Sequence, residues 1–240
     1  MTKTYSPDFA NNYDTFIGGY SKQHKIVKKL IKKYHPTSKK LLEIACGTGN
    51  MLKAFNQTHT IYGLDISKDM INIAKSKLPK AKLYVKDMTN FNLKKKFDVV
   101  LCFYDAINHL ISFKSWEKMF LQVSNHLDKN GIFIFDLTTM YRMIQRSKDP
   151  ILVSKHKNMI ITAFVTRVDK YTFKSRFQII KKNDQQKWSC IEEYVVENCF
   201  EIEKVKKSLK KFFKIEEVFD YYQSVPTSKS KILFFICRKK

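Results

Sequence analysis

Glycines and carboxylates follow three successive strand-like segments of this sequence, in an arrangement suited to binding a nucleoside. The first segment leads into Gly47 and Gly49, within LLEIACGTGN at residues 41–50. A glycine pair after a strand lets the backbone approach a ligand closely, and the next helix offers free N–H groups. The second segment ends in Asp65, where a carboxylate is placed to accept both hydroxyls of a ribose. The third ends in Asp87-Met88, a carboxylate for an adenine amino group beside an apolar side chain for the ring face.

The glycine turn departs from the dinucleotide fingerprint G-x-G-x-x-G. Counted from the first glycine, the third would stand at position 52, where the sequence has Leu52. The remaining pattern is E-x-A-x-G-x-G, in which Glu43 and Ala45 precede the two glycines. A nicotinamide or flavin site is therefore disfavoured. Each aspartate also has an ordinary interpretation, Asp65 as a helix N-cap or turn residue and Asp87 as a turn residue.

Strand-like and helical segments alternate through the first part of the chain, which predicts a parallel sheet buried on both faces. The expected strands are Lys40–Ala45, Thr60–Leu64, Lys82–Val85, Phe97–Phe103 and Ile132–Leu137, and the expected helices are Met51–Phe55, Lys68–Lys77 with Ser67 as its cap, and Trp116–Leu127. Before them, residues 8–34 are typical of helices, with an interruption at Gly18-Gly19. Ligands of open α/β sheets bind at the carboxyl ends of the strands, which is where the residues above are expected.

The pattern changes after Pro150. Residues 151–200 hold alternating segments separated by polar turns, which predict an antiparallel β insert. A helix is expected again over Glu201–Phe212, followed by strands at Ile215–Tyr222 and Lys231–Cys237. We therefore expect one α/β domain made of residues 1–150 and 201–240, with the insert at residues 151–200 between its fifth and sixth strands.

Five stretches, in chain order, carry a resemblance to a known family: LLEIACGTGN, YGLDISKDM, VKDMTNF, FDVVLCFYDAINHL and GIFIFDLTT. Together they resemble the class I S-adenosylmethionine-dependent methyltransferases, and the resemblance covers nearly the whole chain. It implies a Rossmann-like, seven-stranded, mostly parallel sheet of order 3-2-1-4-5-7-6, with an N-terminal helical lid at residues 1–35. The lid is similar to that of small-molecule N-methyltransferases, including the glycine N-methyltransferase and amino-sugar dimethyltransferase groups. Ala45 departs from the commonest form, which has glycine there.

The resemblance also implies S-adenosyl-L-methionine as the cofactor and assigns contacts to it by position. The assigned residues run from the lid to the end of the fourth strand. They are Tyr13 and Lys22 in the lid, Glu43 and the backbone from Ala45 through Gly47 to Gly49 at the methionine end, Asp65 at the ribose with Ile66 beside it, Asp87 and Met88 at the adenine, and Phe103 under the sulfonium. Lys22 is expected at the cofactor carboxylate; the alternative is an ordinary solvated lysine.

Candidate acceptor-side residues cluster after the fourth strand: Tyr104, Asp105, Asn108 and His109. Methyl transfer from a sulfonium needs mainly alignment and exclusion of water, and it needs a general base only when the acceptor arrives protonated. Histidine suits that task, so His109 is the candidate base and Tyr104 the second catalytic candidate. The alternative is that His109 caps or packs a helix. Asp136 and Tyr141, after the fifth strand, are further candidates for the acceptor pocket.

The formal net charge of +23 admits two interpretations. One is a polyanionic partner, such as RNA or a phosphorylated substrate. The other is a lysine-biased composition, which we favour because lysines far outnumber the five arginines and are spread along the chain as doublets and triplets. Two nucleic-acid signatures are also missing from the sequence. FYDA stands where enzymes that methylate adenine carry [DN]-P-P-[FYW], and there is no Pro-Cys pair for cytosine chemistry.

We expect a cytoplasmic enzyme that methylates a small molecule, at an amine nitrogen, as a monomer or homodimer. The five cysteines include no CxxC pair, which indicates reduced thiols, and no Cys/His cluster has metal-site spacing. No apolar run reaches the roughly 20 residues of a membrane helix, and the N-terminus lacks the apolar core of a secretory signal. An RNA methyltransferase and a non-catalytic cofactor-binding protein are the alternatives.

Overall fold

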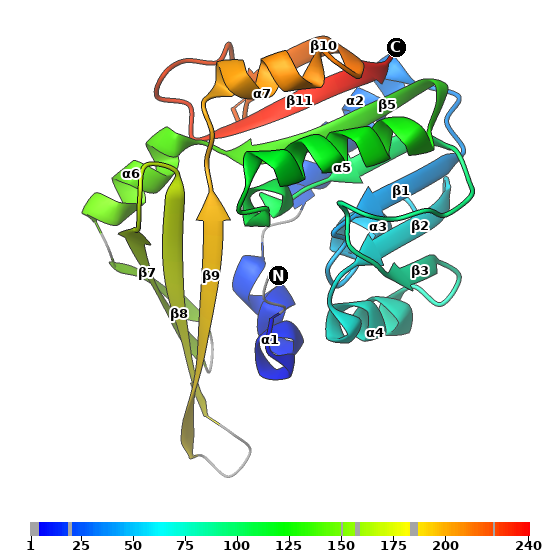
Figure 1. Ribbon diagram of the computed structural model, residues 1–240. Coiled ribbons are helices and arrows are strands. Elements are labelled where there is room, and N and C mark those ends of the chain that lie inside the picture. The colour runs from blue at the N-terminus through cyan, green and yellow to red at the C-terminus, as the bar shows by residue number, and fades with distance from the viewer. Residues whose placement is uncertain (1–4, 19–20, 150, 157–158, 183–186, 223) are drawn as a thin grey trace.

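A sheet of seven strands forms the centre of the computed structural model (Figure 1), which describes residues 5–18, 21–149, 151–156, 159–182, 187–222 and 224–240. The strands are β1 (Lys40–Ile44), β2 (Thr60–Asp65), β3 (Lys82–Val85), β4 (Phe97–Cys102), β5 (Leu127–Thr138), β10 (Phe213–Asp220) and β11 (Ile232–Lys239). Their order is β3-β2-β1-β4-β5-β11-β10, and all pairs are parallel except those of β11 with β5 and β10. The predicted order 3-2-1-4-5-7-6 is confirmed, with β10 and β11 as the sixth and seventh strands.

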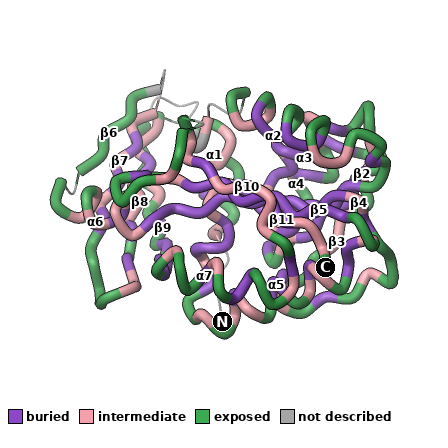
Figure 2. The backbone as a smooth tube through the Cα atoms, turned by 90° about the horizontal axis from the view of Figure 1, so that it is seen from above, coloured by how far each residue is buried: buried purple, intermediate pink, exposed green. Residues whose placement is uncertain are grey.

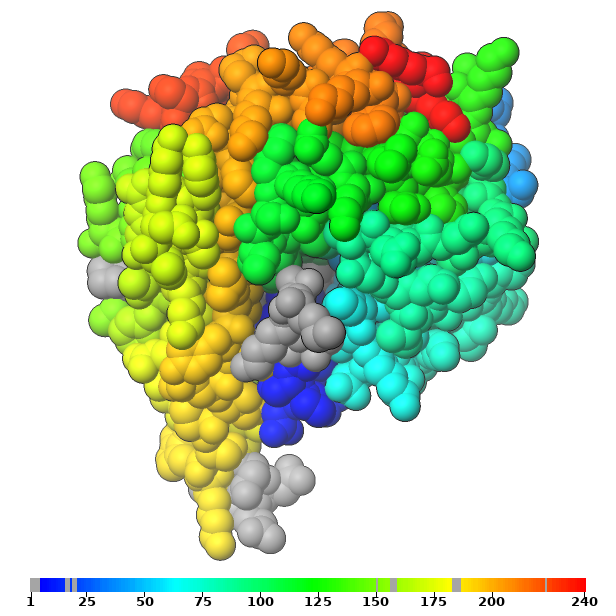
Figure 3. Space-filling model, viewed as in Figure 1, coloured from blue at the N-terminus to red at the C-terminus, as the bar shows by residue number. Residues whose placement is uncertain are grey.

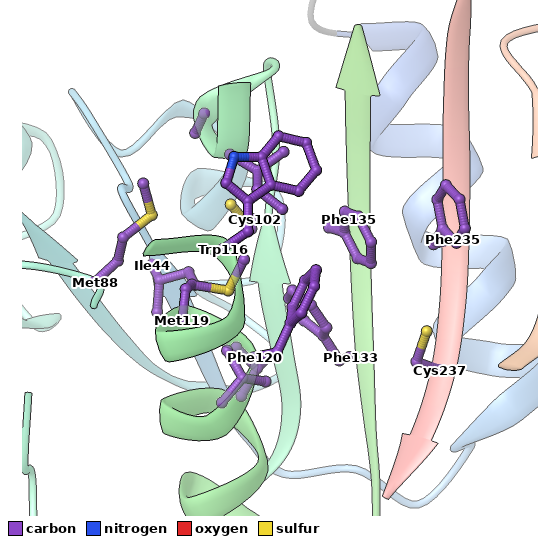
Figure 4. Close-up of a cluster of buried hydrophobic side chains, with 14 of the residues drawn as sticks. Ile44, Met88, Cys102, Trp116, Met119, Phe120, Phe133, Phe135, Phe235 and Cys237 are labelled. Carbon is purple, nitrogen blue, oxygen red and sulfur yellow. The ribbon is translucent and has the colours of Figure 1, made fainter. Parts of the chain in front are cut away.

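Helices cover both faces of this sheet because its strands are apolar on both sides. The helices are α1 (Pro7–Ile17), α2 (Ser21–Tyr34), α3 (Asn50–Lys53), α4 (Lys68–Lys77), α5 (Phe113–His126), α6 (Met140–Lys148) and α7 (Ile202–Leu209). α5 and α7 share one buried cluster with the sheet, and α2, α3 and α4 share the other. Figure 4 shows Trp116 and Phe120 of α5 beside Phe133 and Phe135 of β5. Figure 2 shows most of the central strands buried, so the sheet is a rigid base for its carboxyl edge.

A second sheet of four antiparallel strands stands beside the first, on the side of the carboxyl ends of β4 and β5 (Figure 1). Its strands are β6 (Ile151–His156), β7 (Met159–Arg167), β8 (Thr172–Lys182) and β9 (Trp188–Asn198), and each pairs with the next. The antiparallel insert predicted between the fifth and sixth strands is thereby confirmed. Figures 1 and 3 show α1 between this sheet and α4. Phe9 of α1 packs on Ile161 and Ile179 of the insert.

The N-terminal helical segment divides as the sequence predicts. α1 begins at a Ser6 cap and ends at Gly18, which has a positive φ of 47°. Gly19, the other residue of the expected interruption, lies outside the described residues. α2 then packs an apolar stripe on the sheet through Ile26, Val27, Leu30 and Ile31. This stripe fixes α2 on the sheet, whereas α1 projects toward the insert.

Two segments differ from the sequence expectations. The sequence does not predict α6, because its apolar stripe rests on Met140, Met143 and Ile144 alone; the Thr139 side chain caps this helix by accepting from the Arg142 N–H. The other segment is β5, which starts at Leu127 directly after α5, five residues before the strand expected at Ile132–Leu137. Gly131 allows the strand to continue there, since a Cβ at this position would lie 3.0 Å from the Phe97 carbonyl oxygen.

Candidate functional site

A cavity lies at the carboxyl ends of β1 to β4; we call it the strand-edge cavity. It collects most of the residues that the sequence predicts as cofactor contacts, together with both catalytic candidates. These are Tyr13, Ala45, Gly47, Asp65, Ile66, Asp87, Met88 and Phe103, with Tyr104 and His109. Separate strand ends supply them, so the parallel sheet itself brings these residues together.

The glycine turn between β1 and α3 forms the floor of this cavity. Ala45, Gly47 and Gly49 all have positive φ, at 52°, 51° and 79°. A Cβ at Gly47 would meet no atom within 4 Å, so its surface faces open space. A Cβ at Gly49 would lie 2.9 Å from Leu78 Cδ1, beyond the end of α4. Gly49 is therefore required for packing against the α4 region and does not line the cavity, whereas Gly47 does.

Asp65, at the end of β2, holds the turn in place. Its Oδ2 accepts from the Gly47 N–H at 2.8 Å and its Oδ1 accepts from the Ser67 N–H at 2.9 Å. Burial raises the pKa of the Asp65 carboxyl, although the backbone N–H groups that it accepts from oppose the shift. Each carboxylate oxygen has lone-pair capacity for a further donor. The residue can therefore support the turn and accept ribose hydroxyls from the same position.

Asp87, at the end of β3, is held by a local turn. Its Oδ1 accepts from the Thr89 N–H at 2.7 Å and from the Thr89 hydroxyl at 2.8 Å. The turn interpretation that the sequence left open thus applies to this residue. It does not exclude a ligand, because the second carboxylate oxygen makes no hydrogen bond to the described residues, and Met88 lies buried next to it.

Glu43 lies beneath the turn on β1, outside the residues that line the cavity. It is 2% exposed, and its Oε2 has no hydrogen-bond partner among the described residues. Burial raises the pKa of Glu43 well above its ordinary value, and the charges of Asp65 and Asp136 add to the shift. A buried carboxyl oxygen without a partner is costly unless a donor completes it. The unpartnered Oε2 beneath the turn can accept a hydrogen bond from a donor that reaches the turn, such as the methionyl end of S-adenosylmethionine.

The N-terminal helix α1 is tied to the turn through Asp14, a residue that the sequence reasoning missed. The Asp14 Oδ1 accepts from the Thr48 hydroxyl at 2.6 Å and from the Asn50 side-chain amide at 2.5 Å, and Lys77 of α4 pairs with its other oxygen. These contacts hold the pKa of Asp14 below its ordinary value, against the effect of burial. The only sequence signal was an acid in the predicted lid.

Lys22 does not join the other predicted residues. Its Nζ lies 4.1 Å from the centroid of the Tyr221 ring and 4.9 Å from that of Tyr222, at the start of the loop between β10 and β11. Lys22 is exposed and is not among the residues that line the strand-edge cavity. The geometry is that of a surface cation–π contact, so a role at the cofactor carboxylate has no support from its position.

Tyr104 and His109 stand on the segment after β4, where the chain turns sharply. Tyr104 and Asp105 both have positive φ, at 62° and 50°, and a single 3-10 turn over Ala106–His109 follows. The His109 Nε2 lies 3.4 Å from the Tyr5 hydroxyl of the lid segment. Burial lowers the pKa of His109, and Asp105 opposes that shift. The imidazole is therefore held in its neutral, proton-accepting form at neutral pH.

A second cavity, which we call the inter-sheet cavity, lies between the central sheet and the β insert. It shares Tyr5, Tyr13, Tyr104 and His109 with the strand-edge cavity, so the two cavities meet at these side chains. Asp105 and Asp136 line it as the sequence predicts for acceptor-side residues. Arg142, Arg146 and Glu197 line it as well, and the sequence reasoning missed these three.

Two predicted acceptor-side residues do not line either cavity. Asn108 is fully buried, and its side-chain amide donates to the Thr138 and Asn198 carbonyl oxygens while its Oδ1 accepts from the Thr138 N–H. It joins the turn after β4 to β5 and β9. Tyr141, on α6, is also absent from the lining of both cavities.

Neither a metal site nor a membrane-spanning helix is present in the described part of the chain. No three His, Cys, Asp or Glu side chains there lie close enough to hold a metal ion together. No described helix is long and apolar enough to cross a membrane.

Comparisons with known proteins point to one activity. Residues 41–131 match the model of a family described as a methyltransferase domain. Two relatives, each 29% identical over 137 residues, are dTDP-3-amino-3,4,6-trideoxy-alpha-D-glucopyranose N,N-dimethyltransferase of Streptomyces venezuelae and dTDP-3-amino-3,6-dideoxy-alpha-D-glucopyranose N,N-dimethyltransferase of Streptomyces fradiae. The alignments cover 55% of this chain, and 58% and 54% of those enzymes. The chain thus spans little more than half the length of these curated relatives.

A solved structure extends the similarity to the whole fold. An S-adenosylmethionine-dependent methyltransferase from Clostridium acetobutylicum ATCC 824 superposes with a TM-score of 0.88, covering 97% of this chain and 98% of its own, at 22% identity. Because the coverage is nearly complete on both sides, the insert and the N-terminal segment are included in the shared fold.

Proposed function

We propose that this chain is a class I S-adenosylmethionine-dependent methyltransferase and that it methylates an amine nitrogen of a small molecule. The meeting of the two cavities carries this proposal. The strand-edge cavity offers the turn and the strand-end carboxylates to the cofactor, and the inter-sheet cavity offers an enclosed space to the acceptor. Tyr104 and His109 line both, so donor and acceptor would meet beside them.

Different residues of the strand-edge cavity bind different parts of the cofactor. Asp65 accepts the ribose hydroxyls, Asp87 and Met88 hold the adenine, and Glu43 with the glycine turn holds the methionyl end, above Phe103. The cofactor supplies a methyl group that is already activated on a sulfonium. The protein then has to align the acceptor with that methyl group and exclude water. The contacts of Asp14 with the turn keep α1 over the cavity, which serves that exclusion.

His109 serves as the general base when the acceptor arrives as an ammonium ion. An amine attacks only through a free lone pair, so one proton has to leave the nitrogen first. The lowered pKa of His109 keeps the imidazole ready to accept it. Tyr104, on the same wall, would position the nitrogen.

Two features favour an amine on a small molecule over RNA. The Streptomyces relatives are named as N,N-dimethyltransferases of amino sugars. The exposed lysines are spread over the molecule: those of α2 and those of α7 lie on helices that cover opposite faces of the central sheet, and Lys86 is the one lysine that lines the strand-edge cavity among the described residues. An RNA-binding surface would need one continuous basic stripe along the carboxyl edge.

Label transfer tests the proposal. The full chain is incubated with S-adenosylmethionine carrying a labelled methyl group and either a metabolite extract or total RNA. We expect label in small amines and none in RNA. Label in RNA would replace the proposed substrate class, and tight cofactor binding without transfer to either fraction would support the non-catalytic alternative. His109→Asn in the same assay should lose transfer while keeping cofactor affinity.

A further inference from the structure

Charges of both signs line the inter-sheet cavity. Arg142 and Arg146 come from α6, Asp136 from the end of β5, and Glu197 from the end of β9. The two carboxyl groups are almost completely buried, at 4% exposure for Asp136 and 6% for Glu197. Figure 1 shows α6 at the junction of the two sheets. The arginines therefore belong to the helix that connects the central sheet to the insert.

These charged groups do not close ion pairs with one another. Within the described residues, no contact of 4.0 Å or less joins Arg142 or Arg146 to a carboxylate. The Arg142 guanidinium donates to the Thr138 hydroxyl at 3.2 Å. Arg146 makes no hydrogen bond to any described side chain or carbonyl group. Both side chains are only partly buried, and two guanidinium groups thus line one cavity with most of their N–H donors free for a ligand.

The neighbouring carboxyl groups balance the two arginines only in part. Burial raises the pKa of Glu197 to about 8 and that of Asp136 to about 7, and the charge of Asp105 adds to both shifts. Both shifts reduce the negative charge that these two groups place in the cavity near neutral pH. Asp105, which also lines the cavity, is the third carboxyl group near the arginines.

We propose that the amine acceptor also carries an anionic group, a carboxylate or a phosphate, which Arg142 and Arg146 bind. This inference rests on the proposed function and names the substrate class for it. The two arginines are four residues apart on one helix, so their side chains lie on the same face and reach one anion. Each guanidinium presents parallel N–H donors that match the paired oxygens of a carboxylate or phosphate. The anion at α6 turns the amine of the same molecule toward Tyr104 and His109.

Anion binding tests this without knowledge of the natural substrate. Inorganic phosphate and acetate are titrated separately into the full chain saturated with S-adenosylhomocysteine, and binding is followed by ligand-observed NMR. The test variant is Arg142→Gln/Arg146→Gln. The matched control is Lys148→Gln/Lys155→Gln, which removes the same charge from two exposed residues outside both cavities. We expect at least tenfold weaker binding of one anion in the arginine variant and little change in the control.

The phosphate and acetate titrations identify the anion, and a separate measurement of cofactor binding tests the proposed function independently. A preference for phosphate indicates a phosphorylated amine, and a preference for acetate indicates an amino acid-like acceptor. The inference would be overturned if the arginine variant bound each anion as tightly as the wild-type chain does. It would also be overturned if the arginine variant and the lysine control weakened anion binding equally. Calorimetry of S-adenosylhomocysteine on each variant is the independent readout. If the chain binds S-adenosylhomocysteine but anion binding does not depend on the arginines, only this inference fails. If the wild-type chain does not bind S-adenosylhomocysteine at all, the proposed function fails.

Discussion

The Asp14 carboxylate of α1 accepts a hydrogen bond from the Thr48 hydroxyl at 2.6 Å, so the lid helix contacts the glycine turn directly. We predict that Asp14→Asn loosens this contact and lowers S-adenosylmethionine affinity several-fold. The effect should stay moderate because the Asp14 side chain is 37% exposed and its charge is screened. Calorimetry measures the affinity, and hydrogen exchange of α1 reports the loosening. Asp8→Asn, on the exposed face of the same helix, is the control and should change neither.

Asp65 supports the glycine turn, and we expect it also to bind the ribose; a pair of nucleosides separates the two roles. Asp65→Ala should weaken adenosine binding by roughly 1–3 kcal/mol, the cost of leaving hydrogen-bonding groups without a partner. The wild-type chain should prefer adenosine to 2′,3′-dideoxyadenosine, and the variant should lose that preference. Equal losses for both nucleosides would instead assign the effect to the turn that Asp65 supports through the Gly47 N–H. Asp149→Ala, an exposed position outside both cavities, is the control.

The two glycines of the turn should respond differently to alanine. Both substitutions place a side chain at positive φ, at a cost of about 1–2 kcal/mol. Gly49→Ala also presses on Leu78 and Ala74, which adds roughly 1–3 kcal/mol of overpacking. Thermal unfolding should therefore show the larger loss for Gly49→Ala. Gly47→Ala, whose methyl group would point into the strand-edge cavity, should show the larger loss of cofactor affinity; the reverse order would contradict this division.

Turnover should depend on the protonation of His109. Because burial lowers the pKa of His109 below its ordinary value near 6.5, the imidazole is neutral above that range. We expect kcat to be constant near neutral pH and to fall as the pH drops through the lowered pKa. His109→Asn should remove this acidic limb and reduce kcat far more than cofactor affinity. An unchanged pH profile in the variant would leave His109 with a packing role only.

Glu197 should make the folded chain less stable at alkaline pH. Its pKa is about 8 in the folded state, above the ordinary value of 4.5, so the folded chain holds a proton that the unfolded chain has released. Stability from this group is complete below about pH 4.5 and is lost as the pH rises through 8. Glu197→Gln should flatten that loss by at least about 1 kcal/mol, the equivalent of one pKa unit. Denaturant unfolding at pH 5 and pH 8.5 measures it, with the exposed Glu192→Gln of the same strand as the control.

The central sheet and the strand-edge cavity could be predicted because their determinants are local. Each apolar strand is followed directly by the residue that it positions, such as Asp65 after β2 or Asp87 after β3, and the parallel arrangement brings those ends together. The glycine turn could be predicted for the same reason. The sequence does not show that its two glycines have different roles, which only the packing of Leu78 against Gly49 reveals.

The inter-sheet cavity could be predicted only in part because its walls meet through long-range packing. Glu197 and Arg146 are far apart in the sequence, and they face one space only after the insert has folded back on α6. α6 itself gives a weak apolar pattern, so its arginines had no expected helix to place them. Lys22, in contrast, was predicted at the site but does not lie there. Its position in the lid segment suggested the cofactor, but the packing of α2 turns it to the rings of Tyr221 and Tyr222.

Tyr5 and Tyr13 line both cavities, and this has a consequence for the order of kinetic events. Both residues belong to the segment that ends in α1, so we expect a displacement of this segment to open both cavities together. Release of the demethylated cofactor would then be coupled to release of the methylated amine. For an acceptor that takes two methyl groups, we expect a monomethylated intermediate to accumulate in free solution during the reaction.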